Sequence, residues 1–123
     1  MMINIHNRQG YQLAVQVQGL KDAPVIVFSN SLGTDHGMWQ AQVAAFTEQY
    51  QVVTYDTRGH GASDVIDATT LSNIAEDVVD VLDALKIEKA HFCGISMGGI
   101  TGLYLAIHHA DRFVSVTIAK RSA

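Results

Sequence analysis

The feature that most constrains the fold is a serine flanked by glycines, which lies between a short apolar run and a segment of small residues. The motif reads G-I-S-M-G at residues 94–98, after the apolar run 90–94 and before a predicted helix over 97–109. A turn this tight holds its central residue in a strained conformation, and the flanking glycines remove side chains that would clash. The pattern predicts a strand–turn–helix unit, with the Ser96 hydroxyl at the carboxyl end of the strand and over the helix N-terminus.

The rest of the chain alternates between short apolar runs and amphipathic segments, which indicates strands and helices in turn. The expected strands cover residues 3–6, 11–18, 25–28, 52–55, 90–94 and 114–118. The first two pair as a hairpin around residues 7–10. Besides the helix after Ser96, two apolar stripes predict helices, Trp39-Val43-Phe46-Tyr50 and Leu71-Ile74-Val78-Val81-Leu82-Leu85. This order implies right-handed crossovers and a doubly wound, mostly parallel sheet with antiparallel pairing at its N-terminal end.

The length, net charge and cysteine count of the chain exclude several classes of protein. With 123 residues the chain supports one domain, and its net charge of −4 argues against a nucleic-acid partner. The lone Cys93 excludes an internal disulfide and fits a reducing cytosol. We find no signal-peptide pattern, no apolar run near the roughly 20 residues of a membrane span, and neither a dinucleotide fingerprint nor a metal-ligand pattern. We therefore expect a soluble, cytoplasmic protein with no membrane partner, no metal and no cofactor.

Polar and glycine-rich residues gather where three of the expected strands end. These segments cover residues 29–35, 56–64 and 94–98. In a doubly wound sheet, ligands bind at the carboxyl ends of the strands. A candidate site is therefore predicted along that edge.

These segments resemble the α/β-hydrolase family, and within it they look most like 3-oxoadipate enol-lactonases. The resemblance is carried by N-S-L-G-T at residues 30–34 with Trp39, D-T-R-G-H-G at 56–61 and G-I-S-M-G-G at 94–99. It runs from about residue 11 to about residue 118 and covers only the first half of the family's fold. The resemblance implies a cytoplasmic hydrolase of bacterial aromatic-compound breakdown, the β-ketoadipate pathway, acting on a small lactone or ester.

The same resemblance implies roles for individual residues. Ser96 would be the nucleophile that attacks the ester or lactone carbonyl and forms an acyl-enzyme. The backbone N–H groups of Leu32 and Met97 would form the oxyanion hole. Asn30, Ser31 and Trp39 would line the substrate pocket, although the helical stripe favours a core position for Trp39.

The acid and the histidine of a catalytic triad are not found where the family's chain order puts them, which is after Ser96. His108 and His109 end the predicted helix, about 18 Å from the serine at 1.5 Å per residue. Asp111 follows that helix, and we interpret it as a solvated turn residue. The triad acid and base are therefore predicted to be absent from this chain.

The remaining histidines are not assigned as the base either. His91 begins the strand that carries the serine, about 16 Å below it. His60 follows a strand two positions away in the sheet, near 10 Å, and is interpreted as a loop-ordering residue. His36 is the least distant, but it precedes the serine in the chain.

Other polar groups are given structural interpretations. We expect Asp56 and Arg58 to pair with each other or to bond to loop backbone, and Cys93 to be a small core residue. A phosphate-binding loop is the alternative to a nucleophile elbow at residues 94–98. Such a loop would follow the first strand of the sheet rather than about the fifth.

The predicted elements stop after a strand, so residues 1–123 are expected to be the N-terminal part of one α/β-hydrolase domain, truncated after about the sixth strand. The apolar strand over 114–118 would then be an open sheet edge, through which the chain could self-associate. Two hypotheses remain: an enol-lactone hydrolase of which this is the N-terminal part, and a non-catalytic hydrolase-like fragment or association module.

Overall fold

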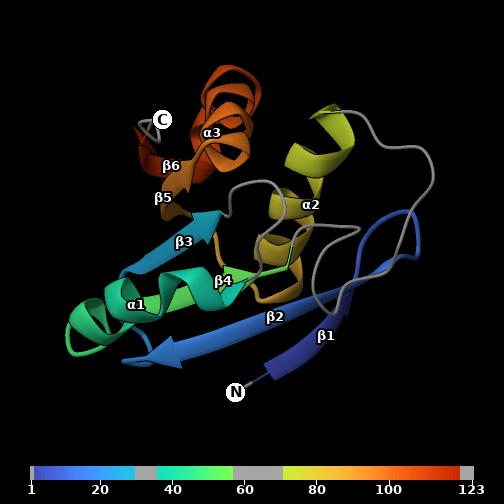
Figure 1. Ribbon diagram of the computed structural model, residues 1–123. Helices are drawn as coiled ribbons and strands as arrows, with labels where there is room; N and C mark the ends of the chain where they lie inside the picture. Colours follow the sequence, from blue (N-terminus) through green and yellow to red (C-terminus); the bar gives the residue numbers. More distant parts are fainter. Residues whose placement is uncertain (1, 30–35, 57–70, 120–123) are drawn as a thin grey trace.

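The computed structural model describes residues 2–29, 36–56 and 71–119, and it contains one six-stranded sheet with helices on both faces (Figure 1). The strands are β1 (Met2–His6), β2 (Gln12–Gly19), β3 (Val25–Ser29), β4 (Gln51–Tyr55), β5 (Ala90–Ile95) and β6 (Phe113–Ala119). The helices are α1 (Gln40–Phe46), α2 (Leu71–Ala84) and α3 (Met97–His108), with 3-10 turns η1 (His36–Trp39) and η2 (Ala110–Arg112). The predicted α/β class is confirmed.

The strands lie in the order β1-β2-β4-β3-β5-β6. β1 pairs antiparallel with β2, and β2 pairs antiparallel with β4. The pairs β4–β3, β3–β5 and β5–β6 are parallel. The predicted mostly parallel sheet with an N-terminal hairpin is therefore confirmed. The carboxyl ends of β3, β4 and β5 meet at one edge, as a doubly wound sheet requires.

The helices divide between the two faces of the sheet. α2 and α3 cover one face, where the larger core cluster includes Val78, Leu82 and Leu105. α1 covers the other face, where a smaller cluster joins Ile26, Phe28, Trp39, Val43 and Val52. Because β3 lies in the middle of this sandwich, every one of its residues is buried, as its continuous apolar run predicts.

The helix predicted from the stripe that begins at Trp39 is shorter than expected. α1 ends at Phe46, Trp39 lies in η1, and Tyr50 follows the helix. The Tyr50 N–H still donates to the Phe46 carbonyl oxygen at 2.9 Å, so helical spacing continues for one turn. The chain must become extended to enter β4 at Gln51, and this ends the helix early.

A buried polar pair anchors the β1–β2 hairpin to α2. The Asn7 side-chain amide donates to Asp77 at 2.8 Å, and both residues are buried. The Asn7 amide oxygen also accepts from the N–H groups of Gln9 and Tyr11, at 3.0 and 2.9 Å. One side chain thus closes the turn and fixes it to the helix.

We expect Asn7→Ala to lower the free energy of unfolding by about 1–3 kcal/mol, because it removes the partner of buried polar groups. Urea unfolding followed by circular dichroism measures this loss. Asn4→Ala is the matched control, since Asn4 is exposed on the neighbouring strand. Equal effects of the two substitutions would contradict the anchoring role of Asn7.

Candidate active site

Ser96 forms the junction between β5 and α3, with no intervening loop. Its backbone has φ 56° and ψ −114°, a conformation that a non-glycine residue seldom adopts. Such a conformation costs of order 1–3 kcal/mol and persists only where the surroundings impose it. The predicted strained turn is confirmed, and it leaves the Ser96 side chain exposed at the carboxyl end of β5.

Gly94 is what makes this turn sterically feasible. A Cβ built on Gly94 would lie 2.1 Å from the Gly98 carbonyl oxygen and 2.3 Å from its carbonyl carbon. The first turn of α3 therefore folds directly over the end of β5, against a residue without a side chain. Gly94 therefore allows the helix backbone to approach the end of the strand closely, as the sequence pattern predicts.

We expect Gly94→Ala to lower the free energy of unfolding by about 3 kcal/mol or more, because the clash is with backbone that cannot rotate away. The comparison is Gly10→Ala, at a glycine with φ 84° and no atom within 4 Å of the added Cβ. That substitution should cost only the backbone penalty of about 1–2 kcal/mol. Thermal unfolding of both variants measures the difference, and a Gly94→Ala cost no larger than that of Gly10→Ala would contradict the steric account.

The N-terminus of α3 lies at the serine. The Ile100 N–H donates to the Ser96 carbonyl oxygen at 3.1 Å and closes the first turn. The N–H groups of the first helical residues, beginning with Met97, have no acceptor within a helix. Within the described chain, the Ser96 side chain makes no capping hydrogen bond to them. Negative charge that develops beside Ser96 would therefore meet N–H donors and the positive end of the helix dipole.

The strand that precedes the other segment expected to contribute to an oxyanion hole ends next to this turn. β3 ends at Ser29, which is in register with Gly94 on β5. Ser29 and Tyr55 are both buried, and their hydroxyl oxygens lie 2.8 Å apart. Burial raises the pKa of Tyr55 well above its ordinary value, so the phenol keeps its proton. Leu32, Asn30 and Ser31 lie outside the described residues.

Trp39 occupies a core position, as its place on the helical stripe favours. Its ring is buried and stacks on Phe28 with 4.7 Å between the ring centroids. It also lines a hollow of about 450 Å³ between α1 and the β5–β6 part of the sheet. Ser96 lines a different hollow, and the two share no residue. The described structure therefore does not bring Trp39 and Ser96 into one pocket.

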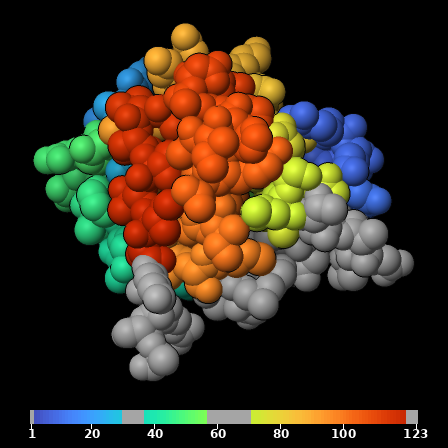
Figure 2. Space-filling view, turned by 90° about the horizontal axis from the view of Figure 1, so that it is seen from above, coloured from blue at the N-terminus to red at the C-terminus, as the bar shows by residue number. Residues whose placement is uncertain are grey.

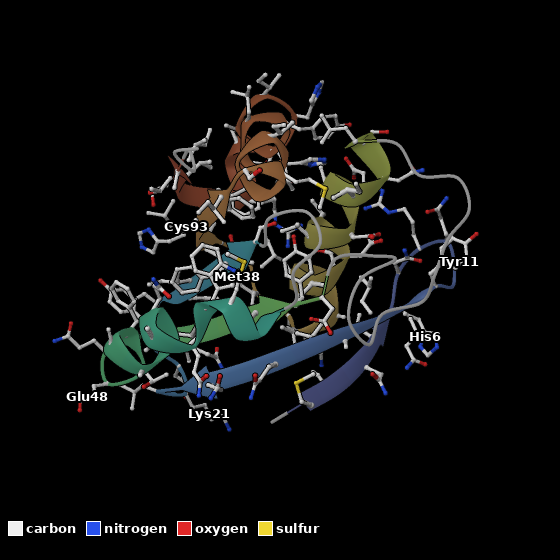
Figure 3. The ribbon with its side chains drawn as sticks, in the orientation of Figure 1. His6, Tyr11, Lys21, Met38, Glu48 and Cys93 are labelled. Carbon is white, nitrogen blue, oxygen red and sulfur yellow. The ribbon has the colours of Figure 1, made fainter. Side chains whose placement is uncertain are left out.

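Cys93 is only half-buried, so the prediction of a core residue holds in part. Its side chain lies on the α1 side of the sheet, as does Met38 (Figure 3). It is incompletely covered because it lines the hollow between α1 and the sheet, which Thr117 of β6 also lines. Burial raises the pKa of the Cys93 thiol, which favours the neutral, less reactive form.

Three of the described histidines lie away from Ser96 or have partners elsewhere. His91 is near the start of β5, and its Nδ1 lies 2.8 Å from the Ser115 hydroxyl. His108 ends α3, at the opposite end from the serine, as predicted. His109 Nε2 lies 2.5 Å from a Glu76 carboxylate oxygen on α2. Local sequence patterns could not reveal this last pair, because only the packing of α3 on α2 brings the two residues together.

The remaining candidate groups are placed only in part. His36 begins η1, and His60 and Arg58 lie outside the described residues. Asp111 is exposed in η2, which confirms its interpretation as a solvated residue. Asp56 is buried just after β4, where its N–H donates to the Ala14 carbonyl oxygen at 2.9 Å.

Across residues 2–29, 36–56 and 71–119, no three His, Cys, Asp or Glu side chains cluster as metal ligands would. In the same part of the chain, the helices are too short or too polar to span a bilayer.

Comparison with known families decides the classification. Residues 24–120 match the family model described as the alpha/beta hydrolase fold. The chain belongs to this family. The fold expected from the strand–turn–helix unit and from the sheet order is thereby confirmed.

Several relatives of this chain are enol-lactonases by name. It is 69% identical to 3-oxoadipate enol-lactonase 1 of Acinetobacter baylyi over 98% of its own length, and 50% identical to 3-oxoadipate enol-lactonase 2 of that organism over 85%. Among solved structures, the enol-lactonase from Burkholderia xenovorans is 45% identical, with a TM-score of 0.89 over 93% of this chain. A hydrolase from Pseudomonas aeruginosa is 41% identical, with a TM-score of 0.91 over 94%.

The match covers only part of each relative. The chain spans 46% and 40% of the two Acinetobacter enol-lactonases, and 45% of the Burkholderia enol-lactonase. The aligned part is the N-terminal part of enol-lactonase 1. The chain is therefore an α/β-hydrolase sequence closely related to enol-lactonases, and it corresponds to less than half of such a protein.

Proposed function

We propose that this chain supplies the nucleophile and part of the oxyanion hole of a serine hydrolase that opens 3-oxoadipate enol-lactone. The observation that carries the proposal is Ser96 at φ 56° between β5 and α3, held there by the close approach of Gly94 and Gly98. This is the geometry of a nucleophile elbow. The choice of substrate rests on the identity with the two Acinetobacter enol-lactonases.

In the proposed reaction, the Ser96 oxygen attacks the lactone carbonyl carbon while its proton passes to a general base. The carbonyl oxygen becomes an oxyanion, which accepts hydrogen bonds from the Met97 N–H and, by resemblance to the family, from the Leu32 N–H. Collapse of this intermediate breaks the ring C–O bond and releases the enol oxygen, which takes up a proton. Water then attacks the acyl-enzyme, and the carboxylic acid leaves as Ser96 regains its proton.

An enol-lactone suits a site of this kind. The leaving group is an enolate, which is more stable than the alkoxide of a simple ester because its charge is delocalised. The site must therefore stabilise mainly the oxyanion. No metal or cofactor enters the proposed chemistry, and we propose that the protein acts in the cytoplasm, where the lone Cys93 stays reduced.

The acid and the histidine of the triad are proposed to come from sequence beyond these 123 residues, since the family order puts them after Ser96. The placement of His91, His108 and His109 supports this. His91 lies beside Ser115, and the other two lie at the end of α3 farthest from the serine. A protein of the family's full length is therefore needed to test turnover.

A chimera provides this test. Residues 1–123 replace the matching part of Acinetobacter enol-lactonase 1, whose own remainder follows them. We expect the chimera to hydrolyse 3-oxoadipate enol-lactone, observed as loss of the lactone absorbance. A folded chimera that leaves the enol-lactone intact would overturn the proposal and favour a non-catalytic, hydrolase-like module.

A further inference from the structure

We propose that Ser29 and Tyr55 are positioning residues for the turn at Ser96. Their buried hydroxyl groups tie the carboxyl ends of β3 and β4 to each other next to the first turn of α3, and so fix where that turn lies. The catalytic consequence rests on the proposed function. The structural part does not, and it is tested on the chain alone.

The first observation is the hydroxyl pair itself. The oxygens of Ser29 and Tyr55 lie 2.8 Å apart, and each residue is only 1% exposed. Burying a hydroxyl is unfavourable unless it forms a hydrogen bond, and Ser29 ends a strand whose other residues are apolar. A hydrogen bond constrains both the separation and the direction of its two groups, which apolar contact does not. The pair therefore holds the two strand ends in one relative position.

A buried carboxylate, Asp77 on α2, acts on the same phenol. Burial raises the pKa of Tyr55 and the charge of Asp77 adds to this, while the hydrogen bond with Ser29 lowers it. The phenol therefore keeps its O–H as a hydrogen-bond donor at neutral pH. Asp77 in turn accepts from the Asn7 side chain at 2.8 Å. The end of β3 thus belongs to a group of buried polar residues that reaches α2 and the hairpin.

Strand register places the pair beside the Ser96 turn. Ser29 on β3 is in register with Gly94 on β5. Residues in register on neighbouring strands project to the same face of the sheet. On that face, the place of a Gly94 side chain is taken by the first turn of α3, because a Cβ there would lie 2.1 Å from the Gly98 carbonyl oxygen. The Ser29 side chain is therefore a neighbour of this turn.

Two helices shield the pair from solvent. Tyr55 belongs to the core cluster that also includes Val78 of α2 and Leu105 of α3. Figure 2 shows these helices next to each other on the outside of the molecule, α3 in orange and the start of α2 in yellow-green. Solvent therefore cannot take over a hydrogen bond that a substitution removes from the pair.

The position of this turn matters for the proposed reaction. The first turn of α3 follows Ser96 directly and includes Met97, whose N–H is a proposed oxyanion donor. Misplacement of catalytic groups by about 1 Å can lower a rate by about 100-fold. Loss of one hydrogen bond that only positions the turn should cost less, about 10-fold in kcat. KM should change little, because no contact with the bound substrate is removed.

The structural part is tested with Tyr55→Phe and Ser29→Ala in the 123-residue chain, each of which removes one hydroxyl of the pair. The NMR signals of the backbone amides of residues 97–99 should shift in both variants. In the double variant the shifts should match those of the single variants rather than their sum, because the second substitution has no bond left to break. Destabilisation alone would leave the signals of the folded state in place. Tyr50→Phe is the matched control, since it removes the same hydroxyl on the α1 face of the sheet, and it should leave these amides unchanged.

The catalytic part is tested in the chimera described above. Tyr55→Phe, Ser29→Ala and the double variant should each lose about 10-fold in kcat with KM within about two-fold of the parent, while Tyr50→Phe keeps the parent kcat. An inactive parent chimera would count against the proposed function, and the amide signals would still decide the positioning role. The inference is overturned if the amides of residues 97–99 do not shift, if the shifts of the single variants add in the double variant, or if an active chimera keeps its kcat in both single variants.

Discussion

Replacing Ser96 with alanine in the chimera should lower kcat for 3-oxoadipate enol-lactone by about 10⁴-fold or more, as removal of a nucleophilic serine does in other hydrolases. The structure gives the reason. Ser96 combines an exposed hydroxyl, a strained backbone at φ 56° and the N-terminus of α3. Initial rates at saturating substrate measure the loss.

Ser115→Ala is the matched control. Ser115 is also exposed, but it lies on β6, beside His91 Nδ1 at 2.8 Å. This variant should keep kcat within a few-fold of the parent chimera. If Ser96→Ala retained more than a few per cent of the activity, Ser96 would not be the nucleophile.

The second large effect concerns the 123-residue chain by itself, which should be nearly inert toward esters and lactones. A serine hydroxyl without a general base is a poor nucleophile near neutral pH. Hydrolases from which triad members have been removed keep only about 10³ to 10⁴ over the reaction in water, through the oxyanion hole and binding. Three of the described histidines, His91, His108 and His109, offer Ser96 no base, because they lie near the start of β5 or at the far end of α3.

Hydrolysis of an activated ester by purified protein of verified mass measures this. We expect a rate close to that of buffer alone, and no further loss in Ser96→Ala. Steady-state turnover of roughly 1 s⁻¹ or more would be typical of an enzyme. That result would contradict the proposal that the base lies outside this chain and would point to His36 or His60.

The sequence predicted the fold well because its strongest signals are local. The apolar run in β3 and the G-x-S-x-G turn at residues 94–98 each depend on neighbouring residues, and the structure has both where they were expected. The end of α1 was predicted less well. Phe46 and Tyr50 keep helical spacing, but the chain must open before β4, and a periodic pattern does not contain that constraint.

Long-range partners could not be predicted from the sequence. The pairs Asn7–Asp77 and Glu76–His109 form only when the hairpin, α2 and α3 pack together. The incomplete burial of Cys93 also depends on packing, because it follows from the hollow between α1 and the sheet that Cys93 lines. For the candidate site, the turn at Ser96 was predictable, whereas its relation to Trp39 required the structure.

The most direct test of Ser96 as the nucleophile is to find which residue becomes covalently modified. The chimera is treated with a fluorophosphonate, which reacts with serines activated by a base, and is then digested and analysed by mass spectrometry. We expect one phosphonyl group per chain, on the peptide that contains Ser96, with activity lost in proportion and no adduct in Ser96→Ala. An active chimera that is modified at another residue, or that Ser96→Ala leaves equally modified, would contradict the assignment.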